Sequence, residues 1–185
     1  PVTGIGGLSD PEYMEKLLEE GQVDMVAMGR QMIADPFLPK KAMKGKSCEI
    51  AHCIRCMRCN MTQLIPYVPY PNGVVYCSVN PVMGRLREIA RENSFENEKK
   101  KILIAGGGPA GMQAALGGLE RGHSVVLCES SDSLGKTLSY SEHIEFKHDI
   151  RMFRDSLISR VQNSQAEIRM NTAVTPELIR ELEPD

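Results

Sequence analysis

Four cysteines set the character of the middle of this chain. Cys53, Cys56 and Cys59 form a C-x2-C-x2-C run, and Cys77 follows eighteen residues later. Three thiolates at this spacing can wrap around one corner of an inorganic cluster, and the run matches a bacterial ligand pattern for [4Fe–4S] clusters. Because such a cluster carries single electrons, the pattern predicts redox partners on either side of it.

Structural zinc is the main alternative for these cysteines, with disulfides or free thiols as a third. Zinc sites usually combine two separated C-x2-C pairs, whereas here three cysteines share one run, so the spacing favours iron–sulfur. Cys48 lies just before the run and could compete with Cys77 as a ligand. Arg55 and Arg58 lie between the ligands, where they either offset the negative charge of a cluster or face solvent.

Composition excludes several classes of function. The formal net charge of −2 gives no bulk attraction for nucleic acid or for an anionic membrane. No apolar run approaches the roughly 18–20 residues that a membrane span needs. Cysteines in metal-ligand spacing favour a reducing compartment. We therefore expect a cytoplasmic location and no nucleic-acid or membrane partner, while the sequence does not specify an oligomeric state.

Residues 1–47 alternate between short apolar strands and helices. The strands are predicted at 2–5 and 24–28, and each is followed by glycine. Ser9 or Asp10 is suited to cap the helix that begins between them. This alternation is typical of a parallel α/β sheet or barrel.

Residues 48–82 have weak periodicity and are rich in Cys, Pro, Asn and Gly. A stretch of this length inside a compact protein needs another organiser, and a metal cluster is one. A short helix is expected from residue 81 to about 92, which closes a segment spanning 48–92. Residues 93–100 are polar and charged and are predicted to form a linker.

A second α/β unit is predicted over residues 101–185. An apolar strand at 102–105 leads through a glycine turn into a helix over about 109–121 and a strand at 124–128. Further along, the pattern predicts a helix over 145–162, a strand near 167–170 and a short helix over 176–182.

The glycine turn of this unit carries a nucleotide-binding pattern. Gly106, Gly108 and Gly111 form G-x-G-x-x-G, and these glycines let the backbone approach a pyrophosphate at the helix N-terminus. Glu129 ends the next strand, 23 residues after Gly106. Its carboxylate can accept hydrogen bonds from an adenosine ribose and would repel a 2′-phosphate. The pattern therefore predicts FAD or NAD rather than NADP.

Together, these motifs resemble a known family. Their order is Gly6-Gly7, Gly29-Arg30, the three-cysteine run, C-S-V-N-P from Cys77, and G-G-G-P-A-G from Gly106. This order is similar to the iron–sulfur flavoenzymes of the old yellow enzyme class, which include 2,4-dienoyl-CoA reductase, enoate reductase, bile-acid enone reductases and trimethylamine dehydrogenase. The resemblance covers essentially the whole chain.

The resemblance implies an α/β fold in three parts. Residues 1–47 would be the C-terminal portion of a (β/α)8 TIM barrel, and 48–92 the [4Fe–4S] segment. After the linker, residues 101–185 would be the first half of a Rossmann-like FAD/NAD-binding domain. Where the family often has a Gly-Gly pair after the second strand of that domain, this chain has Leu134-Gly135-Lys136.

The resemblance also assigns cofactors to residues. The FMN phosphate would lie at the loops after two neighbouring barrel strands, held by Gly6, Gly7, Gly29 and Arg30. The remaining ligands would be Cys53, Cys56, Cys59 and Cys77 for the cluster, and Gly106, Gly108, Gly111 and Glu129 for FAD.

The activity implied by the resemblance is an electron relay. NADH passes a hydride to FAD, single electrons cross the [4Fe–4S] cluster to FMN, and reduced FMN reduces the activated C=C bond of an enoate, enoyl-CoA or enone. In the amine dehydrogenase branch, ADP can replace FAD and the flow reverses. A third interpretation is a non-enzymatic, zinc-stabilised nucleotide-binding module.

No catalytic residue is assigned, because the catalytic and substrate-binding residues of this family lie on earlier barrel strands. The chain opens at Pro1 without an initiator Met and stops at Asp185 just after a helical pattern. Both ends are expected to be cuts through a larger protein. We therefore expect residues 1–185 alone to show no turnover.

Overall fold

The structure, a computed structural model, describes residues 1–60, 75–92 and 98–185. Residues 61–74 of the predicted cluster segment and 93–97 of the predicted linker lie outside the described residues. The chain divides into two compact units, Pro1–Ile89 and Ala90–Asp185.

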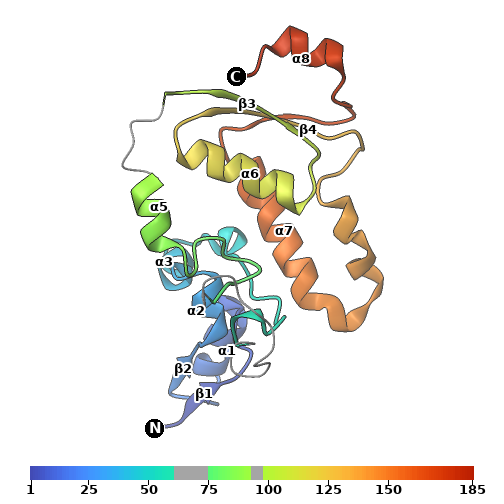
Figure 1. Ribbon diagram of the computed structural model, residues 1–185. Coiled ribbons are helices and arrows are strands. Elements are labelled where there is room, and N and C mark those ends of the chain that lie inside the picture. The colour runs from blue at the N-terminus through green and yellow to red at the C-terminus, as the bar shows by residue number, and fades with distance from the viewer. Residues whose placement is uncertain (61–74, 93–97) are drawn as a thin grey trace, which may run out of the picture. The chain divides into compact units, whose positions relative to one another are not determined.

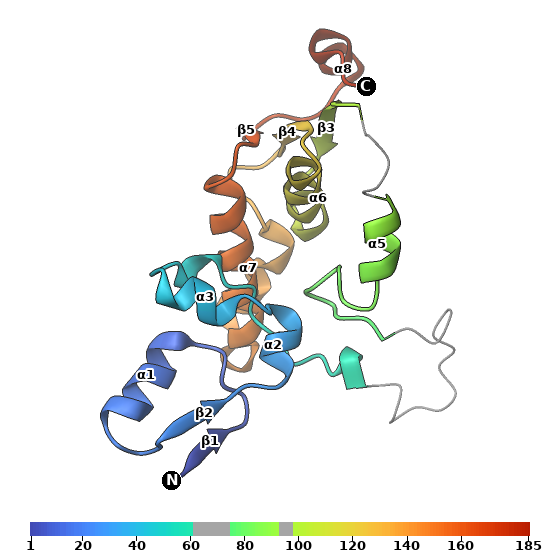
Figure 2. The same ribbon diagram turned by 90° about the vertical axis from the view of Figure 1, so that its left-hand side faces the viewer.

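The first unit contains two parallel strands (Figure 2). β1 (Thr3–Ile5) pairs with β2 (Met25–Ala27), and the register places Gly4 opposite Val26. Helix α1 (Pro11–Glu19) makes the crossover between the two strands, as a parallel pair requires. The helices after β2 are α2 (Arg30–Ala34) and α3 (Leu38–Met43).

Helix α1 begins at one of the two predicted capping residues. The Asp10 side chain accepts a hydrogen bond of 3.0 Å from the backbone N–H of Glu12, which satisfies one of the donors that a helix start leaves unpaired. The buried face of α1 carries Met14, which packs with Leu38 and Ile50. Because Ile50 belongs to the cysteine segment, this core joins that segment to the strands and helices before it.

The cysteine segment itself has little regular structure where it is described. Its elements are the 3₁₀ turns η1 (Ser47–Glu49) and η2 (Arg58–Asn60) and the helix α5 (Leu86–Glu92). Helix α5 begins five residues later than predicted, after a series of turns. The described part of the segment belongs to no sheet, so contacts with other elements hold it in place.

The second unit is built on three parallel strands in the order β3-β4-β5. The strands are β3 (Lys101–Ala105), β4 (Ser124–Cys128) and β5 (Glu167–Arg169). The helices are α6 (Pro109–Glu120), α7 (His148–Gln162) and α8 (Pro176–Leu182), with the 3₁₀ segments η4 (Lys136–His143) and η5 (Glu145–Lys147) before α7.

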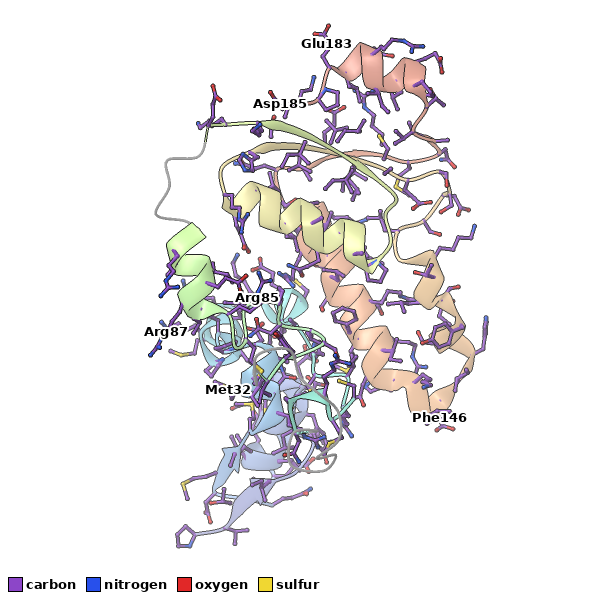
Figure 3. The ribbon with its side chains drawn as sticks, viewed as in Figure 1. Met32, Arg85, Arg87, Phe146, Glu183 and Asp185 are labelled. Atoms are coloured by element: carbon purple, nitrogen blue, oxygen red, sulfur yellow. The ribbon has the colours of Figure 1, made fainter. Side chains whose placement is uncertain are left out.

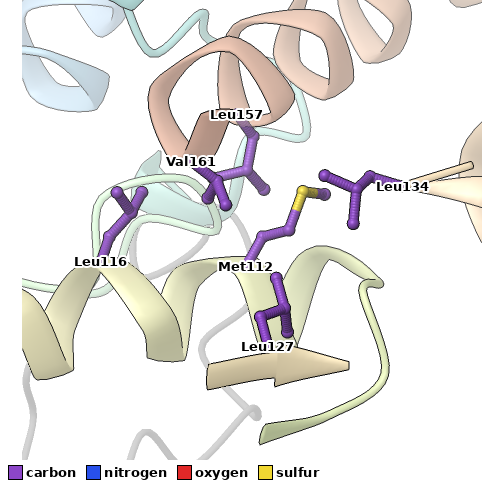
Figure 4. Close-up of a cluster of buried hydrophobic side chains, with 6 residues drawn as sticks. All are labelled: Met112, Leu116, Leu127, Leu134, Leu157 and Val161. Atoms are coloured by element: carbon purple, nitrogen blue, oxygen red, sulfur yellow. The ribbon is translucent and has the colours of Figure 1, made fainter. Parts of the chain in front are cut away.

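Helices cover both faces of this sheet (Figure 1). Leu127 points to the face covered by α6 and α7, whereas Val126 and Cys128 point to the opposite face and pack with Leu182 of α8. The cluster on the first face is Met112, Leu116, Leu127, Leu134, Leu157 and Val161 (Figure 4). Burial of each large side chain of this kind stabilises the fold by about 1.5–3 kcal/mol.

The end of the described chain is tied to the start of this sheet. Asp185 accepts a hydrogen bond of 2.7 Å from the backbone N–H of Lys101, and its own N–H donates to the Lys101 carbonyl at 3.0 Å (Figure 3). These two bonds bring α8 back beside β3.

The predicted α/β class is confirmed, since all pairings between described strands are parallel. The predicted helix over 145–162 is divided, because residues 145–147 form a 3₁₀ turn and α7 begins at His148. Within the described ranges, no helix combines the length and the apolar character that crossing a bilayer would demand.

Two glycines of α6 offer a matched test of this packing. A β-carbon at Gly111 would overlap the Gly106 carbonyl oxygen, whereas one at Gly117 meets no described atom within 4 Å beyond the helix backbone. We expect Gly111→Ala to lower the free energy of unfolding by about 2 kcal/mol or more. Gly117→Ala should be neutral or stabilise by up to about 1 kcal/mol. Urea unfolding measures both, and equal midpoints would contradict this packing.

Candidate functional site

A pocket of about 240 Å³ lies where β1 and β2 end. Gly6 and Gly7 line it from the loop after β1, and Gly29 and Arg30 line it from the loop after β2. These are the four residues that the family resemblance places around an FMN phosphate. The parallel pairing brings them together, because the carboxyl ends of parallel strands meet at one edge of a sheet.

The backbone of this pocket is shaped for close approach by a ligand. Gly6 has φ of +112° and Gly7 of +64°, which glycine adopts without strain. A β-carbon at Gly6 or Gly29 would meet no described atom within 4 Å, so the space beside these residues is open. Arg30 adds a guanidinium, whose planar set of donors matches a phosphate. The residues present therefore fit a phosphate group.

A second guanidinium reaches this pocket from the cysteine segment. The Nη2 atom of Arg55 donates a hydrogen bond to the Gly7 carbonyl at 3.1 Å. Its guanidinium atoms lie 3.4 Å from the position that a Gly7 β-carbon would take. Arg55 and Cys53 both line the pocket. The sequence suggested Arg55 only as a neighbour of the cluster, and this long-range contact was missed.

The loop of the three-cysteine run is tightly turned. Arg55 has φ of +50° and Met57 of +61°, conformations that are costly for residues with a side chain. The backbone N–H of Arg55 is hydrogen-bonded to the Cys53 thiol, and that of Val79 donates to the Cys77 Sγ atom at 3.4 Å. Such N–H···S bonds favour the thiolate, which is the form that binds metal.

The structure gathers part of the predicted ligand set. Burial raises the pKa of the Cys53 thiol, and the charges of nearby Cys77 and Cys56 raise it further. The Cys56 thiol lies 3.3 Å from the Ser78 hydroxyl, next to Cys77. Among the described residues, however, no group of three or more His, Cys, Asp or Glu side chains is close enough to hold a metal ion. Since metal binding completes thiolate sites of this kind, the four-cysteine set stays a prediction.

Gln31 fixes the position of the first cysteine. Its side chain is only 3% exposed. The amide nitrogen donates to the Ala51 carbonyl at 3.0 Å, and the amide oxygen accepts from the Cys53 N–H at 2.8 Å. Sequence reasoning missed Gln31, because a single glutamine beside Arg30 carries no local signal. Only its burial against the cysteine segment reveals its role.

A second buried polar group joins the same segment to α2 and α3. Asp35 is 4% exposed and accepts hydrogen bonds from the Ala51 N–H at 2.9 Å and from the Lys41 ammonium at 2.5 Å. Later in the cysteine segment, the side-chain amide of Asn80 donates a hydrogen bond of 2.8 Å to the Ile33 carbonyl in α2. Asp35 thus supplies a partner for a backbone N–H of the cysteine segment, whose described residues belong to no sheet.

In the second unit, the predicted nucleotide turn forms at the start of α6. Gly106 has φ of +105° and Gly108 is the N-cap residue of α6. No side chain of the described residues caps this end, so its first N–H groups have no side-chain acceptor there. Gly111 allows the helix to pack directly on the turn. This geometry fits an anionic pyrophosphate.

The carboxylate of Glu129 lies beside this turn. It accepts hydrogen bonds of 2.7 Å from the N–H and the hydroxyl of Ser131 and from the N–H of Gly107. These bonds, those of Ser131 first, lower the pKa of Glu129 to about 2. The group is therefore ionised at neutral pH, as the predicted repulsion of a 2′-phosphate requires.

The Leu134-Gly135-Lys136 sequence has a structural reason. Leu134 is buried in the core between α6 and α7 (Figure 4), and a β-carbon on Gly107 would collide with its side chain. Gly135 has φ of +67° and donates a hydrogen bond of 2.9 Å to the Gly107 carbonyl. The pair thus supports the glycine turn from behind.

Comparison with known families matches both sites. Residues 1–49 match the NADH:flavin oxidoreductase / NADH oxidase family, and residues 101–181 match the FAD dependent oxidoreductases. Both matched stretches are therefore similar to flavin-dependent oxidoreductases, and each match covers less than half of the chain. The first match contains the part of the pocket formed by the loops after β1 and β2 but not Arg55, and the second contains the α6 turn and Glu129.

Individual relatives point to the same class of enzyme. NADH oxidase from Thermoanaerobacter brockii is 40% identical over 100% of this chain and 28% of its own length. Cinnamate reductase from Clostridium sporogenes is 32% identical over 100% of this chain and 27% of its own length. Among solved structures, a 2-naphthoyl-CoA reductase complex has a TM-score of 0.83 and 29% identity over 96% of this chain and 26% of that chain.

These comparisons confirm the predicted resemblance to flavin oxidoreductases. They also show that the chain spans about a quarter of the length of the relatives it matches. The names of two relatives refer to small molecules, cinnamate and 2-naphthoyl-CoA. The residue assignments and segment boundaries remain predictions.

The role of Gln31 is open to a direct test. Gln31→Ala leaves the buried Ala51 carbonyl and Cys53 N–H without their partner. We expect it to lower the free energy of unfolding by about 1–3 kcal/mol. Gln22→Ala, at an exposed glutamine of the same unit, should change it by less than about 0.5 kcal/mol. Urea unfolding compares the two, and similar losses would contradict a specific role for Gln31.

The low pKa of Glu129 predicts a pH-dependent contribution to stability. The pKa of Glu129 is about 2 in the folded chain, whereas the ordinary value for a glutamate is 4.5. Its contribution to stability is therefore complete above pH 4.5 and is lost as pH falls toward 2. Glu129→Gln should therefore be less stable than the parent at neutral pH, and the difference should shrink on acidification. Denaturant unfolding across this range measures it. The exposed Glu120→Gln is the control, and a difference independent of pH would contradict the assignment.

Proposed function

We propose that this chain forms part of an NADH-dependent flavin oxidoreductase that reduces the activated C=C bond of an enoate, enoyl-CoA or enone. In this proposal residues 1–47 end an FMN-binding TIM barrel, 48–92 hold a [4Fe–4S] cluster, 93–100 are a linker and 101–185 begin an FAD-binding domain. When bound, the flavins supply hydride and single-electron chemistry and the cluster carries single electrons between them.

The observation that carries this proposal is the composition of the pocket after β1 and β2. Backbone turns at Gly6-Gly7 and at Gly29 meet there with the guanidinium groups of Arg30 and Arg55. A phosphate is recognised by this combination of backbone N–H groups and positive charge. The loops after two neighbouring strands are also where TIM barrels bind phosphate. The pocket therefore supports FMN, with its phosphate against Arg30.

The loops around the cysteines support the proposed cluster. Cys53, Cys56, Cys59 and Cys77 are proposed as its ligands. The buried Gln31 holds the first of these, and N–H···S hydrogen bonds orient the Cys53 and Cys77 sulfurs. Hydrogen bonds to sulfur stabilise the negative charge of a cluster and so adjust its potential. These residues hold the group and fix its surroundings, whereas substrate contacts belong to other parts of the proposed enzyme.

The α6 turn and Glu129 support an adenine dinucleotide in the second unit. Gly106, Gly108 and Gly111 would approach the pyrophosphate, and the ionised Glu129 would accept ribose hydroxyl groups. The ADP portion of FAD is the part that this site contacts. The amine dehydrogenase alternative has ADP at the same position, so the nucleotide that the protein releases distinguishes the two.

Cofactor content tests the proposal. The full-length protein, purified without oxygen, should contain FMN, FAD, iron and acid-labile sulfide, and should oxidise NADH when cinnamate is added. Residues 1–185 alone should show no turnover, because no substrate-contacting residue is assigned to them. Stoichiometric zinc without iron would contradict the cluster, and released ADP without FAD would support the amine dehydrogenase alternative.

Two cysteine variants provide the matched control. Cys53→Ser should lose iron, because the proposal makes it a ligand. Cys48→Ser, an exposed cysteine five residues earlier in the sequence, should retain it. Iron analysis and visible absorption measure both, and equal iron in the two variants would contradict the proposed ligand set.

A further inference from the structure

Arg55 belongs to two parts of the first unit at once. It lies two residues after Cys53, inside the three-cysteine run, yet its side chain lines the pocket after β1 and β2. We propose that Arg55 binds the FMN phosphate together with Arg30, and so couples retention of FMN to the folded state of the cysteine loop. This inference rests on the proposed FMN site.

Charge is the first reason for this assignment. A phosphate monoester carries about −1.5 to −2 charges at neutral pH, more than one guanidinium neutralises. Arg30 enters the pocket from the start of α2, and Arg55 enters it from the cysteine loop. Two guanidinium groups from different segments therefore match the charge that one alone does not.

The orientation of Arg55 is the second reason. Its Nη2 atom donates to the Gly7 carbonyl at 3.1 Å, which places the planar group against the glycine turn. The phosphate is proposed to lie at that same turn, beside the open space at Gly6. A guanidinium has five N–H donors in a plane, so one group can bind a carbonyl and an anion together.

The cysteine loop provides the coupling. Gln31 binds the carbonyl of Ala51 and the N–H of Cys53, and so holds the backbone that leads to Arg55. Arg55 itself has φ of +50°, so the direction of its side chain depends on a tightly turned backbone. A change that releases Cys53 displaces the guanidinium two residues later. Loss of iron should therefore weaken FMN binding and, because linkage is reciprocal, bound FMN should strengthen the binding of iron.

Arg58 separates this role from a simple effect of charge near the cluster. It lies in the same loop, beside Cys59, and carries the same charge. Within the described part of the chain, it is not among the residues that line the pocket. If Arg55 only offset the charge of the cluster, removal of either arginine would have similar consequences.

The test compares FMN with riboflavin, which lacks the phosphate. The full-length protein, freed of flavin with its iron retained, is titrated with each compound as wild type, Arg55→Ala, Arg55→Lys and Arg58→Ala. Arg55→Ala should weaken FMN binding about tenfold or more and leave riboflavin binding unchanged. Arg55→Lys should show a smaller loss, because it keeps the charge without the fork, and Arg58→Ala should bind FMN like wild type.

Iron content and visible absorption establish that the cysteine loop of each variant still holds its iron. Arg55→Gly removes the same side chain and accepts a positive φ without strain, so it replaces Arg55→Ala where alanine does not fold. In wild type, removal of iron should weaken FMN binding more than riboflavin binding. In Arg55→Ala or Arg55→Gly, removal of iron should produce no further phosphate-specific loss.

The outcomes separate this inference from the proposed function. If Arg55→Ala with intact iron binds FMN like wild type, the inference is overturned and the FMN site stands. Equal losses for FMN and riboflavin would show a merely structural role and would also overturn it. If wild type does not prefer FMN to riboflavin, the phosphate site itself is wrong, and the proposed function fails together with the inference.

Discussion

The buried hydrogen bonds of Gln31 hold the cysteine segment against the strand-and-helix part of the first unit. The described residues of that segment belong to no sheet, and the side chains of Gln31 and Asp35 pair with backbone groups of Ala51 and Cys53. Buried polar groups are costly to leave unpaired, and this cost makes the arrangement specific. Gln31 directly follows Arg30 in the sequence. The short helix α2 therefore positions both the Arg30 guanidinium at the pocket and, through Gln31, the first cysteine of the run.

In the second unit, the glycine turn is held by close packing of the α6 backbone against the turn. Gly111 lets α6 approach the Gly106 carbonyl, and Leu134 fills the space that a side chain at Gly107 would take. The Glu129 carboxylate then accepts an N–H from this turn. The two sites thus differ in charge, with guanidinium groups at the first and an ionised carboxylate at the second. A phosphate suits the first, and a ribose without a 2′-phosphate suits the second.

The named relatives of this chain are oxidoreductases. The chain covers 28% and 27% of the length of two of them, so each is slightly less than about four times as long as this chain. The contribution that we propose for the chain is cofactor binding by loops at the ends of parallel strands. In both units, the strand ends bring together groups that are far apart in sequence. This is the general reason why parallel α/β folds carry their sites at one edge of the sheet.

Periodicity, glycine and capping residues were sufficient to place the strands and most helices, because these features act within a few residues. Asp10 at the start of α1 and the turn at Gly106 are examples. Glu129 was also identifiable from motif spacing, whereas Gly6, Gly7, Gly29 and Arg30 were identified only through the family resemblance. Gln31, Arg55 and the support from Leu134 were decided by tertiary structure alone. Their roles depend on partners 20 to 48 residues away in the sequence, and such partners are chosen by packing, which no local pattern records.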